Sequence, residues 1–160
     1  AFIGEKRLMV NSPKVATYDL QPQMSTLKLT SAIITELQKS EADFVCLNFA
    51  NADMVGHTGD YNAIIKAVEA VDLCTKRVVE SGLKNDYSFI ITADHGNADF
   101  AINNDGTPNT AHSTNPVPCF AINTGFCKLE NGKLGDIAPT ILKIMGLEIP
   151  NEMTGKILIK

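Results

Sequence analysis

Residues 87–97 read YSFIITADHGN, an apolar run that ends in an Asp-His-Gly turn. The run does not alternate polar with apolar residues, which is typical of a strand covered on both faces of a sheet. Similar apolar runs occur at residues 7–10, 44–49 and 119–122. Between them lie longer stretches with apolar residues three and four positions apart, as in amphipathic helices. The alternation predicts an α/β fold with a mostly parallel sheet sandwiched by helices.

Three stretches are predicted to be helices. The longest begins at Asp60, a suitable N-cap, and ends near Gly82. A second helix is expected over residues 26–39, and a third from about Asp136 to Gly146. The expected buried stripe of the longest helix consists of Ile64, Ile65, Val68, Val71, Thr75, Val78 and Val79.

Composition narrows the class of protein. The 160 residues suffice for one domain with a real core, and they carry a formal charge of −4 with scattered basic residues. This distribution offers no cationic face for nucleic acid, so we expect no nucleic-acid partner. No apolar stretch approaches the roughly 20 residues that a membrane span needs, so we expect no membrane partner.

The cysteines and the first residues indicate the compartment and the extent of the chain. The four cysteines form no CxxC pair. They are interpreted as reduced thiols of a cytoplasmic protein, with a disulfide as the alternative. The start has no signal-peptide pattern and no initiating Met, and it enters a short apolar run at once. We therefore expect the chain to be a fragment of a longer protein.

All three histidines follow predicted strands, and each has an aspartate beside it or nearby. Asp53 and His57 stand four apart in NADMVGHTGD (51–60), Asp94 and His95 end the strand of TADHGN, and His112 lies in TAHSTNPVP. Ligands of open α/β sheets gather just outside the carboxyl ends of the strands, so the three groups are expected to meet on one rim. Each motif alone is more often a capping pair, a solvated pair or a loop histidine than a metal ligand. Their conjunction favours a metal site.

The residue types restrict the metal. Carboxylate and imidazole ligands without thiolate suit Mn²⁺, Zn²⁺, Fe²⁺ or Co²⁺ better than a closed structural zinc site. Two sets of ligands are expected, one of Asp53, His57 and His112 and one of Asp94 and His95. Neither set fills the coordination sphere of a metal ion, so substrate oxygens can occupy the remaining positions. Two such ions about 3.5–4 Å apart can hold the attacking and leaving oxygens of a phosphoryl transfer.

Four strings resemble successive signatures of the cofactor-independent (2,3-bisphosphoglycerate-independent) phosphoglycerate mutases. They are SPKVATYDLQPQMS (12–25), NADMVGHTGDY (51–61), TADHGNAD (92–99) and AHSTNPVP (111–118). Asp-His-Gly followed by a histidine and Val-Pro is shared across the wider alkaline phosphatase superfamily. The first two strings are more specific, and the resemblance extends over essentially the whole chain.

The resemblance implies an isomerase that interconverts 3-phosphoglycerate and 2-phosphoglycerate through a phosphoserine held by two Mn²⁺ ions, with Co²⁺, Zn²⁺ or Mg²⁺ possible. Carried over by motif, Asp53, His57 and His112 would bind one ion, and Asp94 and His95 the other. The nucleophilic serine is expected in an N-terminal segment outside this sequence. The chain is thus expected to carry metal ligands but no catalytic residue, and to be inactive alone.

The resemblance also implies the place of the chain in the whole protein. Residues 1–160 would be the C-terminal portion of an alkaline-phosphatase-like metal-binding domain, incomplete without its N-terminal segment, and residues 1–24 would return from an inserted domain. The partner would be a small phosphoglycerate substrate. The full-length protein would be monomeric, whereas the isolated chain is expected to self-associate. The alternatives are a phosphopentomutase or phosphatase of the same superfamily, and a non-catalytic metal-binding module.

Overall fold

A computed structural model describes residues 2–160, which fold as two compact units of an α/β protein. The first unit comprises Ala1–Asn85 and His95–Pro116, and the second comprises Asp86–Asp94 and Val117–Lys160. No helix in the described part of the chain is both long enough and apolar enough to cross a membrane.

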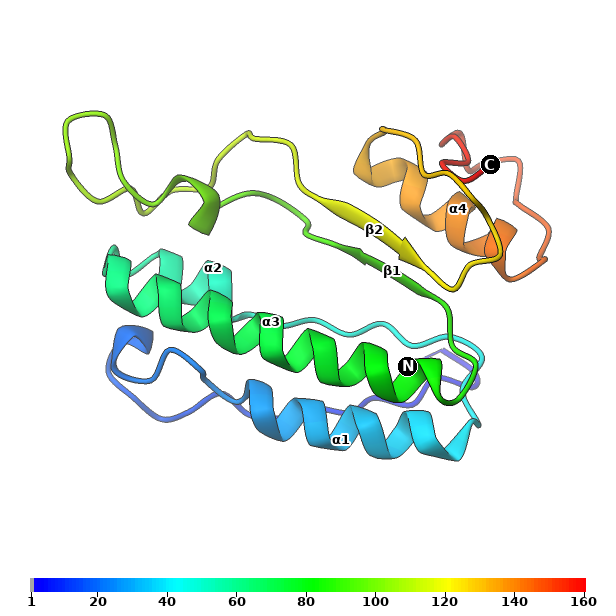
Figure 1. The fold of residues 1–160 in the computed structure, drawn as a ribbon, viewed down its shortest axis with the longest axis horizontal. Coiled ribbons are helices and arrows are strands. Elements are labelled where there is room, and N and C mark those ends of the chain that lie inside the picture. The colour runs from blue at the N-terminus through cyan, green and yellow to red at the C-terminus, as the bar shows by residue number, and fades with distance from the viewer. Residues whose placement is uncertain (1) are drawn as a thin grey trace. The chain divides into compact units, whose positions relative to one another are not determined.

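Three α-helices build the first unit. They are α1 (Thr26–Lys39), α2 (Asn51–Gly56) and α3 (Tyr61–Leu83), and α3 packs against both of the others (Figure 1). Short 3₁₀ turns occur at Tyr18–Leu20 and Ala98–Phe100. The bounds predicted for α1 are confirmed. The buried cluster between these elements consists of Met24, Val55, Ala63, Ile64, Ala67 and Ala101.

Helix α3 begins as predicted, but its buried face is shifted. The side chain of Asp60 accepts the backbone N–H of Ala63 at 2.8 Å, which confirms the N-cap. Two residues of the expected stripe, Ile65 and Val68, are 42% and 45% exposed. The small residues Ala63 and Ala67 are buried in their place, in the same cluster as Val55 of α2. The prediction placed the larger side chains inward, whereas the small ones let the helices approach closely.

The second unit holds the strands. Strand β1 (Phe89–Thr92) pairs antiparallel with β2 (Cys119–Ile122), in the register Phe89↔Ile122 to Thr92↔Cys119. These are the only strands described for residues 2–160, so the mostly parallel sheet predicted from the sequence is not found there. Parallel neighbours need a crossover connection, usually a helix. Residues 93–118, which connect β1 to β2, contain a three-residue 3₁₀ turn but no α-helix that could serve as such a crossover. Strand β2 therefore runs antiparallel to β1.

Two further predicted strands are not formed in the described part of the chain. Residues 7–10 and 44–49 have no strand partner. Some of their apolar side chains are open to solvent, with Met9 85% and Phe44 56% exposed. Both predictions were wrong for this structure, because an apolar run becomes a strand only where a neighbouring backbone completes its hydrogen bonds.

The C-terminal segment is tied to α4 (Ile137–Ile144), which follows the 3₁₀ turn Leu134–Asp136. The buried carboxylate of Asp136 accepts the backbone N–H groups of Lys133 at 2.9 Å and Lys156 at 2.8 Å. These bonds hold the pKa of Asp136 below its ordinary value. The buried hydroxyl of Thr140 donates to the Asp136 carbonyl and accepts the backbone N–H of Leu158. The third predicted helix is thereby confirmed.

Candidate metal centre

The helical turn α2 carries the first two candidate ligands. Its first residue, Asn51, is buried, accepts the hydroxyl of Thr26, and donates its amide to the carbonyl of Pro22 at 2.8 Å. These contacts fix the start of the turn against α1. Asp53 and His57 then project from one face, because residues four apart are neighbours on a helix.

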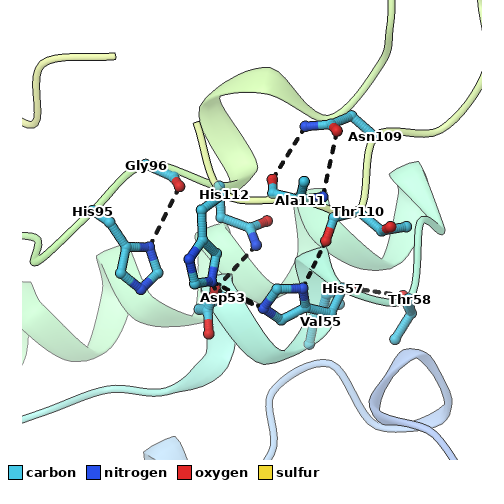
Figure 2. A network of polar contacts seen from close by, with 11 residues as sticks. Asp53, Val55, His57, Thr58, His95, Gly96, Asn109, Thr110, Ala111 and His112 are labelled. Atoms are coloured by element: carbon cyan, nitrogen blue, oxygen red, sulfur yellow. Dashed lines mark hydrogen bonds and ion pairs between the residues drawn. The ribbon is translucent and has the colours of Figure 1, made fainter. Parts of the chain in front are cut away.

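The orientation of the His57 ring is set by a backbone carbonyl. Nδ1 of His57 lies 2.7 Å from the carbonyl oxygen of Thr110. A carbonyl oxygen can only accept, so Nδ1 carries the proton of this bond. Nε2 of the same ring faces Oδ1 of Asp53 at 3.1 Å. The ring therefore presents its second nitrogen to the carboxylate (Figure 2).

His112 completes a triangle with these two side chains. Its Nε2 lies 3.1 Å from Oδ1 of Asp53 and 3.2 Å from Nε2 of His57. The side chains of the three residues are between about a third and a half exposed. We call Asp53, His57 and His112 the ligand triangle. Its corners come from a helical turn and from a loop 55 residues further along the chain.

The loop of His112 is held by a second carboxylate. Oδ2 of Asp99 accepts the hydroxyl of Ser113 at 2.8 Å and the amide of Asn115 at 2.7 Å. We call these three residues the Asp99 clasp. The hydrogen bonds from Asn115 and Ser113 hold the pKa of Asp99 below its ordinary value. Gly96 lies against the clasp, where a Cβ would collide with Ser113 and Asp99, and its carbonyl accepts the Ser113 N–H at 2.8 Å.

The remaining two predicted ligands are placed differently. The His95 ring stacks on the His112 ring with a centroid separation of 3.7 Å, so that His112 lies between His95 and His57 (Figure 2). Ligand atoms of Asp53, His95 and His112 all lie within 4.8 Å of one another. Asp94 is exposed and belongs to the second unit. Its assignment as a ligand remains a prediction from the sequence.

The ligand triangle fits a divalent cation. Ligands about 2.1 Å from a common ion at ordinary coordination angles lie roughly 3.0–3.4 Å from one another, and the triangle has sides of 3.1, 3.1 and 3.2 Å. Because Nδ1 of His57 is engaged by the carbonyl of Thr110, Nε2 is the ring nitrogen that faces the carboxylate of Asp53 and could bind a cation there.

Several contacts of the site do not follow from the residue pattern. Asn97 is buried and donates its amide to Oδ1 of Asp53 at 3.0 Å. The carbonyl of Thr110 and the Asp99 clasp were also not predicted. The one available signal was the polar Asn97 directly after an Asp-His-Gly turn. Carbonyls and loop clasps depend on three-dimensional contacts that leave no local pattern.

Comparisons with known proteins place the chain among metalloenzymes. The model of the metalloenzyme superfamily matches residues 1–149. The 2,3-bisphosphoglycerate-independent phosphoglycerate mutase of Flavobacterium johnsoniae is 60% identical over 153 residues, covering 96% of this chain and 30% of that protein. The enzyme of the same name from Bacteroides thetaiotaomicron is 58% identical over 160 residues, covering 99% of this chain and 32% of the relative.

A solved structure agrees with this assignment. The crystal structure of Leishmania mexicana phosphoglycerate mutase at low cobalt concentration matches 94% of this chain with a TM-score of 0.84 and 30% sequence identity, and the match covers 31% of that chain. The present chain spans about a third of the length of these relatives. The resemblance inferred from the sequence motifs is confirmed. The chain belongs to the metalloenzyme superfamily and is similar to part of the 2,3-bisphosphoglycerate-independent phosphoglycerate mutases.

Proposed function

We propose that this chain supplies the metal-binding part of a cofactor-independent phosphoglycerate mutase. This isomerase would move a phosphoryl group within its substrate, between 3-phosphoglycerate and 2-phosphoglycerate. The names of the relatives at 58–60% identity support the substrate and the reaction. The single structural observation that carries the proposal is the ligand triangle, with sides of 3.1–3.2 Å.

The ligand triangle would hold one divalent ion. Two imidazole nitrogens and one carboxylate oxygen leave coordination positions open, and the ligand side chains are partly exposed, so phosphoryl oxygens can reach the site. A bound divalent ion supplies charge neutralisation at phosphoryl oxygens and orients the attacking and leaving groups. Asp53 contributes the only negative charge of the triangle. The two rings are held at their positions by the carbonyl of Thr110 and by the Asp99 clasp.

A second ion would be bound by Asp94 and His95. Its remaining ligands, including the nucleophilic serine, would come from the part of the whole protein that this sequence does not contain. We propose Mn²⁺ for both positions, with Co²⁺, Zn²⁺ and Mg²⁺ as chemically compatible ions. The similar Leishmania mexicana enzyme was crystallised at low cobalt concentration. The chain alone should bind an ion without turning over substrate, because the nucleophile is elsewhere.

The same proposal gives the chain its place in the enzyme. Residues 1–160 would form the C-terminal portion of the metal-binding domain, with residues 1–24 returning from an inserted domain. The exposed apolar runs at 7–10 and 44–49 would join a mostly parallel sheet within the whole protein. The enzyme would be a cytoplasmic monomer acting on a small molecule. The compartment is inferred from the sequence, in which the four cysteines form no CxxC pair.

Titration calorimetry with Mn²⁺ tests the proposed site on the chain itself. Asp53→Asn and His112→Gln each remove one corner of the triangle, and each should abolish measurable binding. The control Asp43→Asn changes an exposed carboxylate outside the site and should leave binding unchanged. Wild-type affinity in both triangle variants would refute the site.

The reaction is tested separately, on the whole protein that contains this chain. Interconversion of 3-phosphoglycerate and 2-phosphoglycerate, followed by ³¹P NMR, should require added Mn²⁺ and should be lost in Asp53→Asn. A whole protein that binds Mn²⁺ through the triangle but leaves both phosphoglycerates unchanged would refute the proposed reaction while leaving the metal site in place.

A further inference from the structure

The side chain of Asn97 does not make the N-capping hydrogen bond that its position suggests. Asn97 is 6% exposed and stands at the N-cap of the 3₁₀ turn Ala98–Phe100. An asparagine at an N-cap commonly accepts a backbone N–H with its side chain, yet Asn97 makes no such bond. Its Nδ2 instead donates to Oδ1 of Asp53, in a different element of the fold. The buried amide thus serves the ligand triangle rather than its own turn.

Gly56 makes room for this amide. Gly56 is buried as the last residue of α2, and a Cβ built on it would collide with Oδ1 and Cγ of Asn97. Its φ is not in the left-handed region, so glycine is not needed for the backbone conformation. A glycine in a helix costs up to about 1 kcal/mol relative to alanine. The packing against Asn97 accounts for this glycine.

The amide acts on the oxygen at which the triangle converges. Oδ1 of Asp53 is the atom that faces Nε2 of both His57 and His112, and it is also the acceptor of the Asn97 bond. A donor fixed at this oxygen limits the rotation of the carboxylate and holds its second oxygen in place. In this orientation Asn97 presents an NH₂ group, which cannot ligate a cation and so does not compete with Asp53.

We propose that Asn97, seated in the space left by Gly56, is a positioning residue that orients the Asp53 carboxylate for a divalent cation. The inference rests on the proposed function, because it takes the ligand triangle as a metal site. Partners of this kind, one bond removed from the ion, typically change metal affinity by about 10- to 100-fold when they are lost.

The test measures Mn²⁺ affinity of the chain by calorimetry. Asn97→Ala should weaken binding by about 10- to 100-fold. Asn97→Leu, which keeps a similar volume without a donor, should weaken it comparably. The control Asn131→Ala removes an exposed amide and should bind as the wild type does. The rise in Tm on adding Mn²⁺ should shrink in both Asn97 variants and persist in the control.

A double-mutant cycle separates positioning from simple packing. Gly56→Ala should weaken Mn²⁺ binding on its own, because the new methyl group displaces the Asn97 amide. In the Asn97→Ala background it should change affinity by less than about twofold, since the three nearest atoms that the methyl would meet all belong to the Asn97 side chain beyond its Cβ. Gly135→Ala, whose Cβ would make only ordinary contact with Lys133, is the matched glycine control.

The outcomes distinguish the inference from the proposed function. Wild-type affinity in both Asn97 variants, with binding lost in Asp53→Asn, would overturn the positioning role and leave the metal site standing. Wild-type affinity in Asp53→Asn would overturn both. Loss of the folded far-UV signal in EDTA by both Asn97 variants would make Asn97 a structural residue and also overturn the inference. Additive effects of Gly56→Ala and Asn97→Ala would refute the role given to Gly56.

Discussion

Replacing Asp99 by alanine should loosen the loop that carries His112. The change removes two hydrogen bonds to a charged acceptor, from Ser113 at 2.8 Å and Asn115 at 2.7 Å. Because the carboxylate is exposed to solvent, we assign each bond about 0.5–1 kcal/mol, the low end for such bonds. Together they amount to about 1–2 kcal/mol, which is roughly a 5- to 30-fold increase in the population of the open loop.

Amide hydrogen exchange measures this opening directly. The backbone N–H of Ser113 donates to the carbonyl of Gly96, so it exchanges only when the loop leaves that carbonyl. Its exchange should accelerate by about 5- to 30-fold in Asp99→Ala. The matched control is Asp105→Ala, because Asp105 accepts bonds only from Thr107 within its own turn. Unchanged exchange at Ser113, or equal acceleration in the control, would refute the clasp.

The clasp also predicts a pH dependence with a definite sign. The pKa of Asp99 is lowered in the folded chain by hydrogen bonds from Asn115 and Ser113. Its stabilising contribution is therefore complete above the ordinary aspartate pKa of about 3.9 and is lost as the pH falls through the lower folded value. Exchange at Ser113, corrected for its intrinsic rate, should rise on acidification below about pH 4. Asp99→Asn should remove this dependence.

Three further predictions concern the second unit and the exposed apolar runs. Thr140→Val should destabilise the chain in urea denaturation by about 1–3 kcal/mol more than Thr35→Val. Both hydroxyls bond the carbonyl four residues earlier, but only Thr140 also accepts a distant backbone N–H, and equal losses would contradict this reading. Because the pKa of Asp136 is lowered in the folded chain, the ionised carboxylate should contribute fully to the free energy of unfolding above about pH 4. This contribution should be lost as the pH falls below that value. Asp136→Asn should show a flatter profile of unfolding free energy against pH, and an identical profile would refute the assignment. The isolated chain should self-associate with rising concentration in sedimentation, less so in Phe44→Ser, and a monomer at all concentrations would exclude this.

The helices were predictable from the sequence because their signals are local. The bounds of α1 and the N-cap at Asp60 follow from residues within one or two turns of each helix end. The buried face of α3 was less accessible to prediction. Apolar spacing pointed to Ile65 and Val68, but burial is decided by which neighbours approach, and the small side chains of Ala63 and Ala67 admit α2.

The strands show why the sheet was harder to predict. The two apolar runs that became β1 and β2 were located correctly, yet their direction depends on the connection between them rather than on their own residues. The runs at 7–10 and 44–49 carry the composition of buried strands and find no strand partner among residues 2–160. An apolar composition suits a segment to a strand, but a strand forms only where a second strand is present to pair with it.

The sequence indicated which residues meet at the site better than it indicated how they are arranged there. Asp53, His57 and His112 meet because a helical turn and a returning loop converge, although the strand predicted before Asp53 is not formed among residues 2–160. His95 stacks on His112 and shares its surroundings, which the division into two ligand sets did not anticipate. The role of Asp94 stays a prediction, because it rests on the motif alone.

All three histidines of the sequence, His57, His95 and His112, lie together at the candidate metal centre, so their NMR signals can report on metal binding. A histidine-selective NMR spectrum should contain three imidazole spin systems, all from residues of this cluster. Paramagnetic Mn²⁺ would then broaden all three signals at sub-stoichiometric loading, while diamagnetic Zn²⁺ would shift them and keep them sharp. A single titration could thus follow the metal without any label, tag or background from histidines elsewhere in the sequence.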